Sequence, residues 1–503
     1  MKYSVTTRRA ALLAALLLTA GAVASCGETA QTPADNKDSA AVTDAVVTEA
    51  AVTEEPRILP DLPEADFGGY EFKILHWFMD GWESRACKDL VADAMNGDTL
   101  NDAVYQRNLA VSERYNVTFS MTQEDFAKIC TTIKKFVTAG EDAYDLAYTR
   151  LYEGKALLTT GCYYNFNALP NIDLTKPWWD VRCKDCMEYD GKLYLMASDI
   201  NIEDKNATAA ILFNKTLASN YDVEDLYALV RDGKWTIDKM REIYSDVSSD
   251  VNGDGVMDAE DLWGFLGGND VGVSFFLGGE GTYIQRDEKG NLIDTFNTEH
   301  NVALTEKIKT VMTDTVNFYN HHDGTQKAPV TDDNEYRDMF AGGHGLFFWS
   351  RLDEVTTLRT LETDFGILPT PKYDEAQKEY CSLVSQHITG LMTVPASISD
   401  PERTGIILEA LAAESMYTVQ PAYYEVALKG KYLRDDDSAE MLDLIFANRM
   451  YDFGEIFDLG GWASQHNIVC KSTSQGVASN YEKYQSKIDK ALIKLVDSLE
   501  ALE

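Results

Sequence analysis

Beyond residue 67, short apolar runs that are typical of buried strands alternate with segments whose apolar residues recur at helical spacing. Residues 70–77 (YEFKILHW) form a short apolar run that is typical of a buried strand, and residues 102–116 carry apolar side chains at helical spacing. A strand, a helix and a strand of the same kind follow at residues 117–121, 125–140 and 144–150. This alternation predicts parallel β-α-β units with right-handed crossovers, and therefore an α/β fold.

Ligands of such parallel sheets bind at the carboxyl ends of the strands. The loops that follow Trp77 and Ala147 are therefore candidate ligand walls. At the other end of the chain, residues 481–503 place apolar side chains at helical spacing among mixed charges. This pattern predicts an amphipathic helix that packs on the folded body.

The N-terminus has the pattern of a secretory signal. Three basic residues among the first nine precede an apolar run that ends in small residues, and this run is too short for a mature membrane span. Residues 23–26 (VASC) resemble the lipobox of bacterial lipoproteins, in which the cysteine is diacylated and the chain is cut just before it. We therefore expect a signal peptide at residues 1–25 and a lipid anchor on Cys26, which would hold the protein at the extracellular face of the cell membrane.

Residues 26–66 are rich in Ala, Thr, Asp and Glu and contain no aromatic side chain. Such a segment buries too little apolar surface to offset the entropy of ordering. It is therefore predicted to be a disordered, acidic tether between the anchor and the folded body.

The remaining residues, 67–503, are too many for one small core and predict two or three domains. A hydrophobic content of 45% and an aromatic content of 11% indicate that this part folds. The formal net charge of −37 argues against nucleic acid as a partner, because the overall field repels phosphate.

The chain has eight cysteines, and seven remain once Cys26 is set aside as the lipidation site. Seven scattered cysteines do not predict a disulfide framework. Cys183 and Cys186 form a C-x-x-C pair without a second pair or a histidine pair that would complete a zinc site. Free thiols or a local disulfide are favoured there over a redox or metal role.

Several short phrases occur in a fixed order behind the lipobox-like segment: YEFKILHW, GKLYLMASD, AILFNK, DGKWT, FGILPTPKY and FDLGGW. In this order the chain resembles the family 1 extracellular solute-binding proteins that serve ABC importers. The resemblance implies a two-lobe, periplasmic-binding-protein-like α/β fold of type II, with a ligand cleft between the lobes. It also implies a monomer without catalytic activity that delivers its solute to ABC permease subunits.

The resemblance further implies that the chain crosses between the lobes near residues 193–200 and 386–394. The N-terminal lobe is then expected at residues 67–193 plus about 386–430. The C-terminal lobe is expected at residues 194–385 plus about 431–503.

Residues 250–261 (DVNGDGVMDAED) have the spacing of a calcium-binding loop, with a glycine at the sixth position for the sharp turn. Asp replaces the usual Glu at the twelfth position, and no long helix is predicted after the loop. A structural Ca²⁺ cofactor is expected, and the alternative is an Asp-Gly-rich turn without metal. The expected ligands are Asp250, Asn252, Asp254, Val256 through its carbonyl, Asp258 and Asp261.

Aromatic faces pack against the C–H face of a sugar ring, while acidic, amide and guanidinium groups bind its hydroxyls. Residues of these types on loops at strand ends are therefore the candidate ligand-binding residues. They are Trp77, Asp80, Trp82, Glu83, Tyr148, Arg150, Asp199, Asn201, Trp349, Arg351 and Trp462. Any single aromatic residue among them is as compatible with a place in the core.

These patterns predict a lipid-anchored, extracellular substrate-binding protein of an ABC importer, with a sugar or oligosaccharide as the expected solute and a peptide or polyamine as open alternatives. Two other classes stay open at this point. A secreted carbohydrate-active hydrolase needs two carboxylates at a defined separation, which no sequence supplies. A receptor that presents its ligand to a membrane sensor would share the same fold and cleft.

Overall fold

Two β-sheets with flanking helices organise the part of the chain that the computed structural model describes, residues 57–80, 87–320, 335–358, 363–428 and 436–502. The signal peptide, Cys26 and the tether as far as residue 56 lie outside these ranges and stay predictions. Residues 57–69 contain neither a helix nor a strand. Within the described ranges, no helix is both long enough and apolar enough to cross a membrane.

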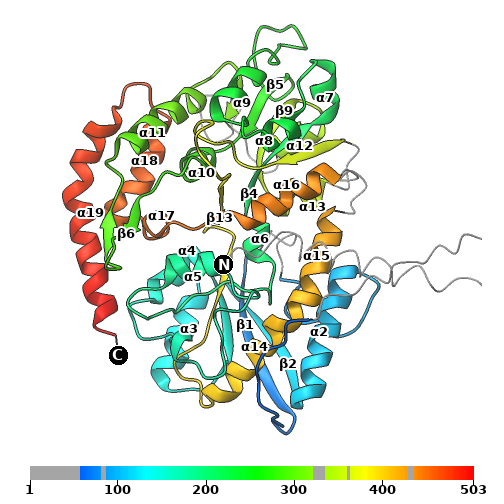
Figure 1. Ribbon diagram of the computed structural model, residues 1–503, viewed down its shortest axis with the longest axis vertical. Helices are drawn as coiled ribbons and strands as arrows, with labels where there is room; N and C mark the ends of the chain where they lie inside the picture. Colours follow the sequence, from blue (N-terminus) through cyan, green and yellow to red (C-terminus); the bar gives the residue numbers. More distant parts are fainter. Residues whose placement is uncertain (1–56, 81–86, 321–334, 359–362, 429–435, 503) are drawn as a thin grey trace, which may run out of the picture. The chain divides into compact units, whose positions relative to one another are not determined.

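The first sheet has the strand order β12-β3-β1-β2. Strand β1 (Tyr70–Phe78) pairs in parallel with β2 (Val117–Asp125) and β3 (Leu146–Arg150), and β12 (Gly390–Thr393) joins β3 in antiparallel orientation. Helices α2 (Thr99–Tyr115) and α3 (Ile129–Ala139) connect the three parallel strands. The β-α-β units predicted from the sequence are therefore confirmed (Figure 1).

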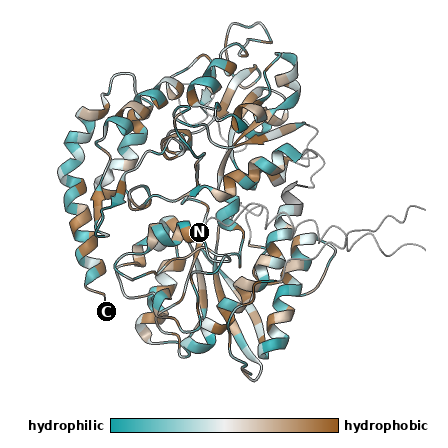
Figure 2. Ribbon diagram, viewed as in Figure 1, coloured by the Kyte–Doolittle hydropathy of each residue, from teal (hydrophilic) through white to brown (hydrophobic). Residues whose placement is uncertain are grey.

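The second sheet has the order β10-β4-β9-β5-β8. Strand β5 is parallel to both β8 and β9, whereas β4 is antiparallel to both β9 and β10. The strands comprise β4 (Ala209–Asn214), β5 (Trp263–Gly267), β8 (Phe318–Asn320), β9 (Gly345–Arg351) and β10 (Phe365–Leu368). Every residue of these strands is buried and most are apolar, as expected of a sheet covered on both faces (Figure 2).

The other described strands form two small pairs, β6 (Ile284–Arg286) with β7 (Leu292–Asp294) and β11 (Ser382–Leu383) with β13 (Arg449–Met450). The helices that follow the first sheet are α4 (Leu151–Gly154), η2 (Lys155–Leu157), η3 (Phe166–Ala168), α5 (Val181–Met187) and α6 (Glu203–Asn206). Those of the central region are α7 (Lys215–Asn220), α8 (Leu226–Arg231), α9 (Ile237–Tyr244), α10 (Asp270–Gly278), α11 (Glu299–Met312), α12 (Glu335–Ala341) and α13 (Leu352–Leu358). The last ones are α14 (Pro401–Tyr417), α15 (Val419–Leu428), α16 (Asp436–Ala447), α17 (Phe453–Phe457), η4 (Leu459–Gly461), α18 (Trp462–Cys470) and α19 (Val477–Glu500).

Local sequence signals explain several helix ends. The carboxylate of Asp98 accepts a hydrogen bond from the backbone N–H of Asn101 at the start of α2, and Asn116 ends the helix in the left-handed conformation. Helix α14 begins with a proline at its first position behind the N-cap Asp400. These caps satisfy backbone groups that the helix itself leaves unpaired.

Two of the phrases that carried the family resemblance meet in the core. The indole N–H of Trp235, in DGKWT, donates to the carbonyl of Pro369, in FGILPTPKY, over 2.9 Å. The backbone N–H of Lys372 donates to the carbonyl of Trp235 over 3.1 Å, and Ile237 returns a bond to Lys372. The two phrases therefore form one packing unit beside the second sheet.

The two segments expected to cross between the lobes contact each other. Met196 and Met392 exchange two backbone hydrogen bonds of 3.0 and 2.9 Å. The first sheet takes its strands from residues 70–150 and 390–393, and the second sheet takes its strands from residues 209–368. The exact lobe boundaries stay a prediction.

The predicted C-terminal amphipathic helix is confirmed as α19, with Tyr481, Ile488 and Leu499 among its buried residues (Figure 2). The Tyr481 hydroxyl donates to Asp294 on β7 over 2.5 Å. The ammonium group of Lys192 donates to the carbonyl of Leu499 over 2.9 Å. The helix is therefore held at both ends by polar contacts and between them by its apolar side.

A buried carboxylate joins α14 to the loop before α5. Trp178 and Trp179 donate their indole N–H groups to the two oxygens of Glu409 over 3.1 and 2.9 Å. Burial raises the pKa of Glu409 to about 7, although these hydrogen bonds lower it in part. The folded protein therefore binds a proton at Glu409 more tightly than the unfolded chain does.

We predict that the free energy of unfolding falls as the pH rises from about 4.5 to about 7. In this range the folded protein still holds the Glu409 proton, whereas the unfolded chain has already lost it. Glu409→Gln removes this contribution and should flatten the decline of the free energy of unfolding, measured by urea titration at several pH values. Glu402→Gln, at an exposed position on the same helix, is the control and should leave the slope unchanged. Equal slopes for wild type and Glu409→Gln would contradict the prediction.

Candidate solute-binding site

The parallel strands of each sheet end where the sequence predicted ligand-binding residues. Strands β1, β2 and β3 run in the same direction, and Trp77, Tyr148 and Arg150 lie at or near their carboxyl ends. In the second sheet β5, β8 and β9 share a direction, and Trp349 and Arg351 occupy the end of β9. Each sheet therefore presents aromatic and charged side chains at its carboxyl edge, which is where open α/β sheets bind ligands.

The rings of Trp77 and Tyr148 both lie close to that of His76, a residue that was not predicted from the sequence. The His76 ring centroid is 6.0 Å from that of Trp77 and 5.6 Å from that of Tyr148. The indole N–H of Trp77 donates to Glu203 Oε2 over 3.1 Å. Glu203 was likewise not among the ligand-binding residues predicted from the sequence. A Cβ on Gly390 would overlap both partners of this bond, so β12 needs glycine there.

The guanidinium of Arg150 contacts several side chains and a carbonyl close to the first sheet. Its Nε donates to Glu153 Oε2 over 2.6 Å, and a second nitrogen bonds the other carboxylate oxygen. The guanidinium also donates to the carbonyl of His387 over 3.2 Å and lies 4.2 Å from the ring centre of Phe126. The positive charge is thus oriented before any solute arrives.

Asp199 and Asn201 lie in the segment between the two sheets. Lys205 donates to Asp199 Oδ1 over 3.3 Å, and Gln420 donates to the carbonyl of Asp199 over 2.8 Å. The side chain of Asn201 is buried, and its Nδ2 has no hydrogen-bond partner.

Trp349 and Arg351 form a pair at the end of β9. The guanidinium carbon of Arg351 lies 6.0 Å from the Trp349 ring centre, and its Nε is 3.4 Å from a carboxylate oxygen of Asp353. Trp349 is 3% exposed, and its indole Nε1 has no hydrogen-bond partner.

Trp462 begins α18 after two glycines with positive φ. Its ring packs against Phe296, Tyr481 and Tyr484, with centroid distances of 4.7, 5.3 and 5.7 Å. It is 3% exposed and belongs to the apolar core, although its Nε1 has no hydrogen-bond partner. Its part in a solute site stays a prediction.

The first predicted ligand wall is described only in part. Asp80 is exposed, whereas Trp82 and Glu83 lie outside the described residues.

Four predicted ligand-binding residues share one property that the sequence does not reveal. Each is buried and has a polar side-chain atom without a hydrogen-bond partner: Tyr148 Oη, Asn201 Nδ2, Trp349 Nε1 and Trp462 Nε1. Buried polar groups are nearly always hydrogen-bonded, so each unpaired one needs an explanation. Other buried side chains, such as Tyr115 and Tyr244, have the same property, so it does not by itself mark a solute site.

A second group missed by sequence reasoning joins η2 to α17. Lys155 donates to Gln386 Oε1 over 3.0 Å and to the carbonyl of Ile456, and Gln386 donates to Glu455 Oε1 over 2.6 Å. Burial raises the pKa of Glu455 to about 8. Only the fold brings these residues together, because they are separated by 69 to 301 positions.

The predicted calcium loop is closed by its own hydrogen bonds. Asp250 accepts from the backbone N–H groups of Gly253 and Gly255 over 2.6 and 2.8 Å, and Asp254 accepts from Val256 over 2.7 Å. The buried Asp261 accepts from Val251 and Asp258 over 3.0 and 2.9 Å. Oxygen donors suit Ca²⁺, and each carboxylate keeps further lone pairs for an ion.

The seven described cysteines are free thiols, including the C-x-x-C pair of Cys183 and Cys186. Burial raises the pKa of both thiols above the usual value. A redox cysteine needs a lowered pKa, so the electrostatics of this pair do not favour a redox role.

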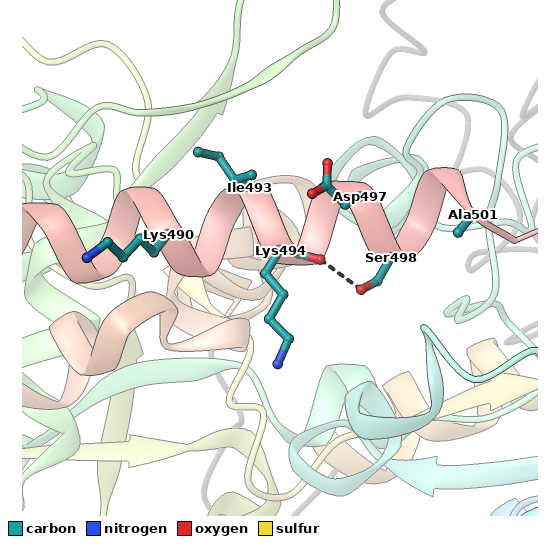
Figure 3. Close-up of a pocket in the computed structure, with 6 residues that line it drawn as sticks. All are labelled: Lys490, Ile493, Lys494, Asp497, Ser498 and Ala501. Carbon is teal, nitrogen blue, oxygen red and sulfur yellow. Dashed lines mark hydrogen bonds between the residues drawn. The ribbon is translucent and has the colours of Figure 1, made fainter.

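A surface hollow on α19 is a poor candidate for the solute site. Lys490, Ile493, Lys494, Asp497, Ser498 and Ala501 line it, and all of them belong to one helix (Figure 3). None of the predicted ligand-binding residues is among them. A hollow lined by a single helix cannot surround a ligand.

No protein-family model and no curated protein sequence matches the chain. Among solved structures, a cyclo/maltodextrin-binding protein in complex with maltotetraose is similar, with 14% identity, coverage of 86% of this chain and 97% of the other, and a TM-score of 0.51. The galacto-N-biose/lacto-N-biose I-binding protein of a Bifidobacterium longum ABC transporter, solved with lacto-N-biose, has 13% identity, coverages of 86% and 98% and a TM-score of 0.52. The GacH receptor of Streptomyces glaucescens, solved without ligand and with acarbose, has 13% identity, coverages of 86% and 100% and a TM-score of 0.50.

At this level of identity the similarity concerns the fold. The chain has the two-lobe α/β fold of periplasmic binding proteins, which the sugar-binding components of ABC transporters share. The fold that the sequence resemblance implied is therefore confirmed.

The unpaired Tyr148 hydroxyl generates a prediction about stability. Tyr148→Phe should leave the free energy of unfolding of the solute-free protein unchanged or slightly higher, because a buried hydroxyl without a partner is removed. Tyr163→Phe is the matched control: this buried hydroxyl donates to the carbonyl of Gly154 over 3.2 Å, and its loss should cost about 1 kcal/mol. Chemical denaturation of both variants checks this, and an equal loss in both would contradict it.

Proposed function

We propose that the protein is the extracellular substrate-binding component of an ABC importer and that it captures a small carbohydrate between its lobes. The observation that carries this proposal is the combination of the fold with predicted ligand-binding residues at the carboxyl ends of the parallel strands in both sheets. The similar structures were solved with maltotetraose, lacto-N-biose and acarbose, which supports carbohydrate as the solute class.

Aromatic and charged residues are proposed to contact different parts of the solute. Trp77, Tyr148 and Trp349 are proposed to supply aromatic faces for the C–H side of a sugar ring, and the unpaired Tyr148 Oη and Trp349 Nε1 would bind its hydroxyls. Arg150 and Asp199 supply charged groups whose orientation is already set by Glu153 and Lys205. A largely pre-formed site of this kind loses little entropy when the solute binds.

Binding is proposed to shift an equilibrium between open and closed arrangements of the lobes. A solute that contacts both lobes only in the closed arrangement favours that arrangement by its differential affinity. The permease subunits of the importer would then recognise the closed form.

The predicted anchor places the protein where this activity is needed. Diacylation of Cys26 would hold the folded body outside the cell membrane, and residues 26–66 would give it reach. The protein is proposed to act as a monomer and to release its solute chemically unchanged.

We predict that a carbohydrate raises the melting temperature of the full chain in a thermal-shift screen that also includes peptides and polyamines. A ligand at a hundred times its dissociation constant stabilises a protein by about 2.7 kcal/mol, which is readily measured. Recovery of the intact sugar from the incubation supports binding without catalysis. Cleavage of the sugar would identify a hydrolase, and stabilisation by peptides or polyamines alone would overturn the carbohydrate assignment.

We also propose that Ca²⁺ binds residues 250–261 and stabilises the loop without taking part in solute binding. The expected affinity is that of extracellular modules, with dissociation constants of roughly 10⁻⁴ to 10⁻³ M. The ion would draw together oxygens of Asp250, Asn252, Asp254, Asp258 and Asp261, with the carbonyl of Val256.

Asp254→Ala should lower the melting temperature in millimolar calcium and have a much smaller effect in chelator, because the calcium contribution is then absent in both proteins. Asp287→Ala is the control, since Asp287 accepts backbone hydrogen bonds from Lys289 and Asn291 in an ordinary turn. Its effect should be the same with and without calcium. Equal effects of Asp254→Ala in both conditions would make the loop a metal-free turn.

A further inference from the structure

Three potential metal ligands that are far apart in the sequence meet at the carboxyl end of β1. His76 belongs to the strand, Cys87 follows eleven positions later in the chain, and Glu203 begins α6. One ligand atom from each side chain lies within 4.8 Å of the others. In the described part of the chain, no other group of three His, Cys, Asp or Glu side chains is gathered in this way.

The neighbours of His76 leave one ring nitrogen for an ion. Nδ1 lies 2.5 Å from the carbonyl of Trp77, and because a carbonyl only accepts, Nδ1 carries the hydrogen. Nε2 faces Glu203 Oε1 at 2.6 Å and shares a proton with it, so its lone pair is available to an ion once that proton leaves. In metal-binding histidines, the ring nitrogen that does not bind the metal usually donates its hydrogen to a carbonyl or carboxylate. This hydrogen bond fixes the tautomer and the orientation of the ring.

Glu203 is arranged in a complementary way. Its Oε2 accepts the indole N–H of Trp77 over 3.1 Å, which leaves Oε1. Oε1 lies 2.6 Å from His76 Nε2, yet neither atom has a hydrogen bond of acceptable geometry. Glu203 is 8% exposed and His76 is 0% exposed. The two atoms are at ion-pair distance and share a proton in the metal-free protein, which a bound ion would displace.

We propose that His76 Nε2, Cys87 Sγ and Glu203 Oε1 bind a divalent transition metal ion of the zinc class. Asp89 is the candidate for a fourth ligand, since its Oδ1 is 3.3 Å from Cys87 Sγ while its Oδ2 is engaged by the backbone N–H of Ile202 over 2.6 Å. On binding, the S–H bond of Cys87 and the N–H bond at His76 Nε2 break, sulfur–metal and nitrogen–metal bonds form, and both protons pass to solvent.

The ligand types select the ion. A thiolate, an imidazole and carboxylate oxygens suit Zn²⁺, which accepts nitrogen, sulfur and oxygen in tetrahedral sites. Ca²⁺ takes oxygen ligands only, so this site is distinct from residues 250–261. The metal would join the end of β1 and Cys87 to the start of α6. The metal site itself does not depend on the proposed function.

Cobalt substitution tests the site, because Co²⁺ bound by a thiolate shows a charge-transfer band in the near ultraviolet and tetrahedral Co²⁺ absorbs strongly in the visible. The reduced full chain is titrated with Co²⁺ in the presence of calcium, which fills any oxygen-only site. We expect both bands to saturate at about one equivalent, and Zn²⁺ to abolish them by displacement.

Cys87→Ser should lose the charge-transfer band, and Cys130→Ser, at a half-buried cysteine on α3 outside the cluster, should keep it. Circular dichroism establishes that each variant is folded. Absence of the band in the wild-type chain overturns the proposal whether or not the variants fold. Persistence of the band in Cys87→Ser also overturns it, since the thiolate would then belong to another cysteine such as Cys183 or Cys186.

Discussion

The guanidinium of Arg107 is the contact on which the candidate site depends. It is fully buried on α2 and donates to the carbonyls of Asp89, Leu90 and Ile200 over 3.0, 2.6 and 2.7 Å. Another bond, of 3.3 Å, reaches the hydroxyl of Ser415 on α14. A buried charge is costly unless its donors are satisfied, and here several carbonyls from distant parts of the chain satisfy them.

This contact determines where two important segments lie. Burial lowers the pKa of Arg107 to about 10, partly offset by Asp89, so the group stays charged at neutral pH. By binding Asp89 and Ile200, it brings the chain after the first ligand wall next to the start of α6. The backbone N–H of Ile202 then bonds the carboxylate of Asp89, and Glu203 follows directly beside Trp77 and His76. The proposed metal site and the part of the candidate solute site around Trp77 therefore share one buried cation.

The same region explains why candidate residues were found with uneven success. Trp77, Tyr148, Trp349 and Arg351 were predicted because strand ends can be read from local periodicity, and the strands lie where that periodicity placed them. His76 stands inside a predicted strand, where a histidine in an apolar run was a signal that went unused. Glu203 offered no such signal, because acidic residues are frequent in a chain of this charge.

By itself, the sequence determined the alternation of strands and helices, the parallel β-α-β units of the first sheet and the amphipathic α19. These features depend on side-chain periods and caps that act within a few residues, so short stretches of sequence are enough to specify them. Only the tertiary structure decided that Trp462 packs in the core, that Tyr148 Oη and Trp349 Nε1 lack partners, and that His76 meets Glu203 across 127 positions of sequence (203 − 76). Contacts of that range are selected by burial and hydrogen bonding in the packed protein, and no local pattern encodes them.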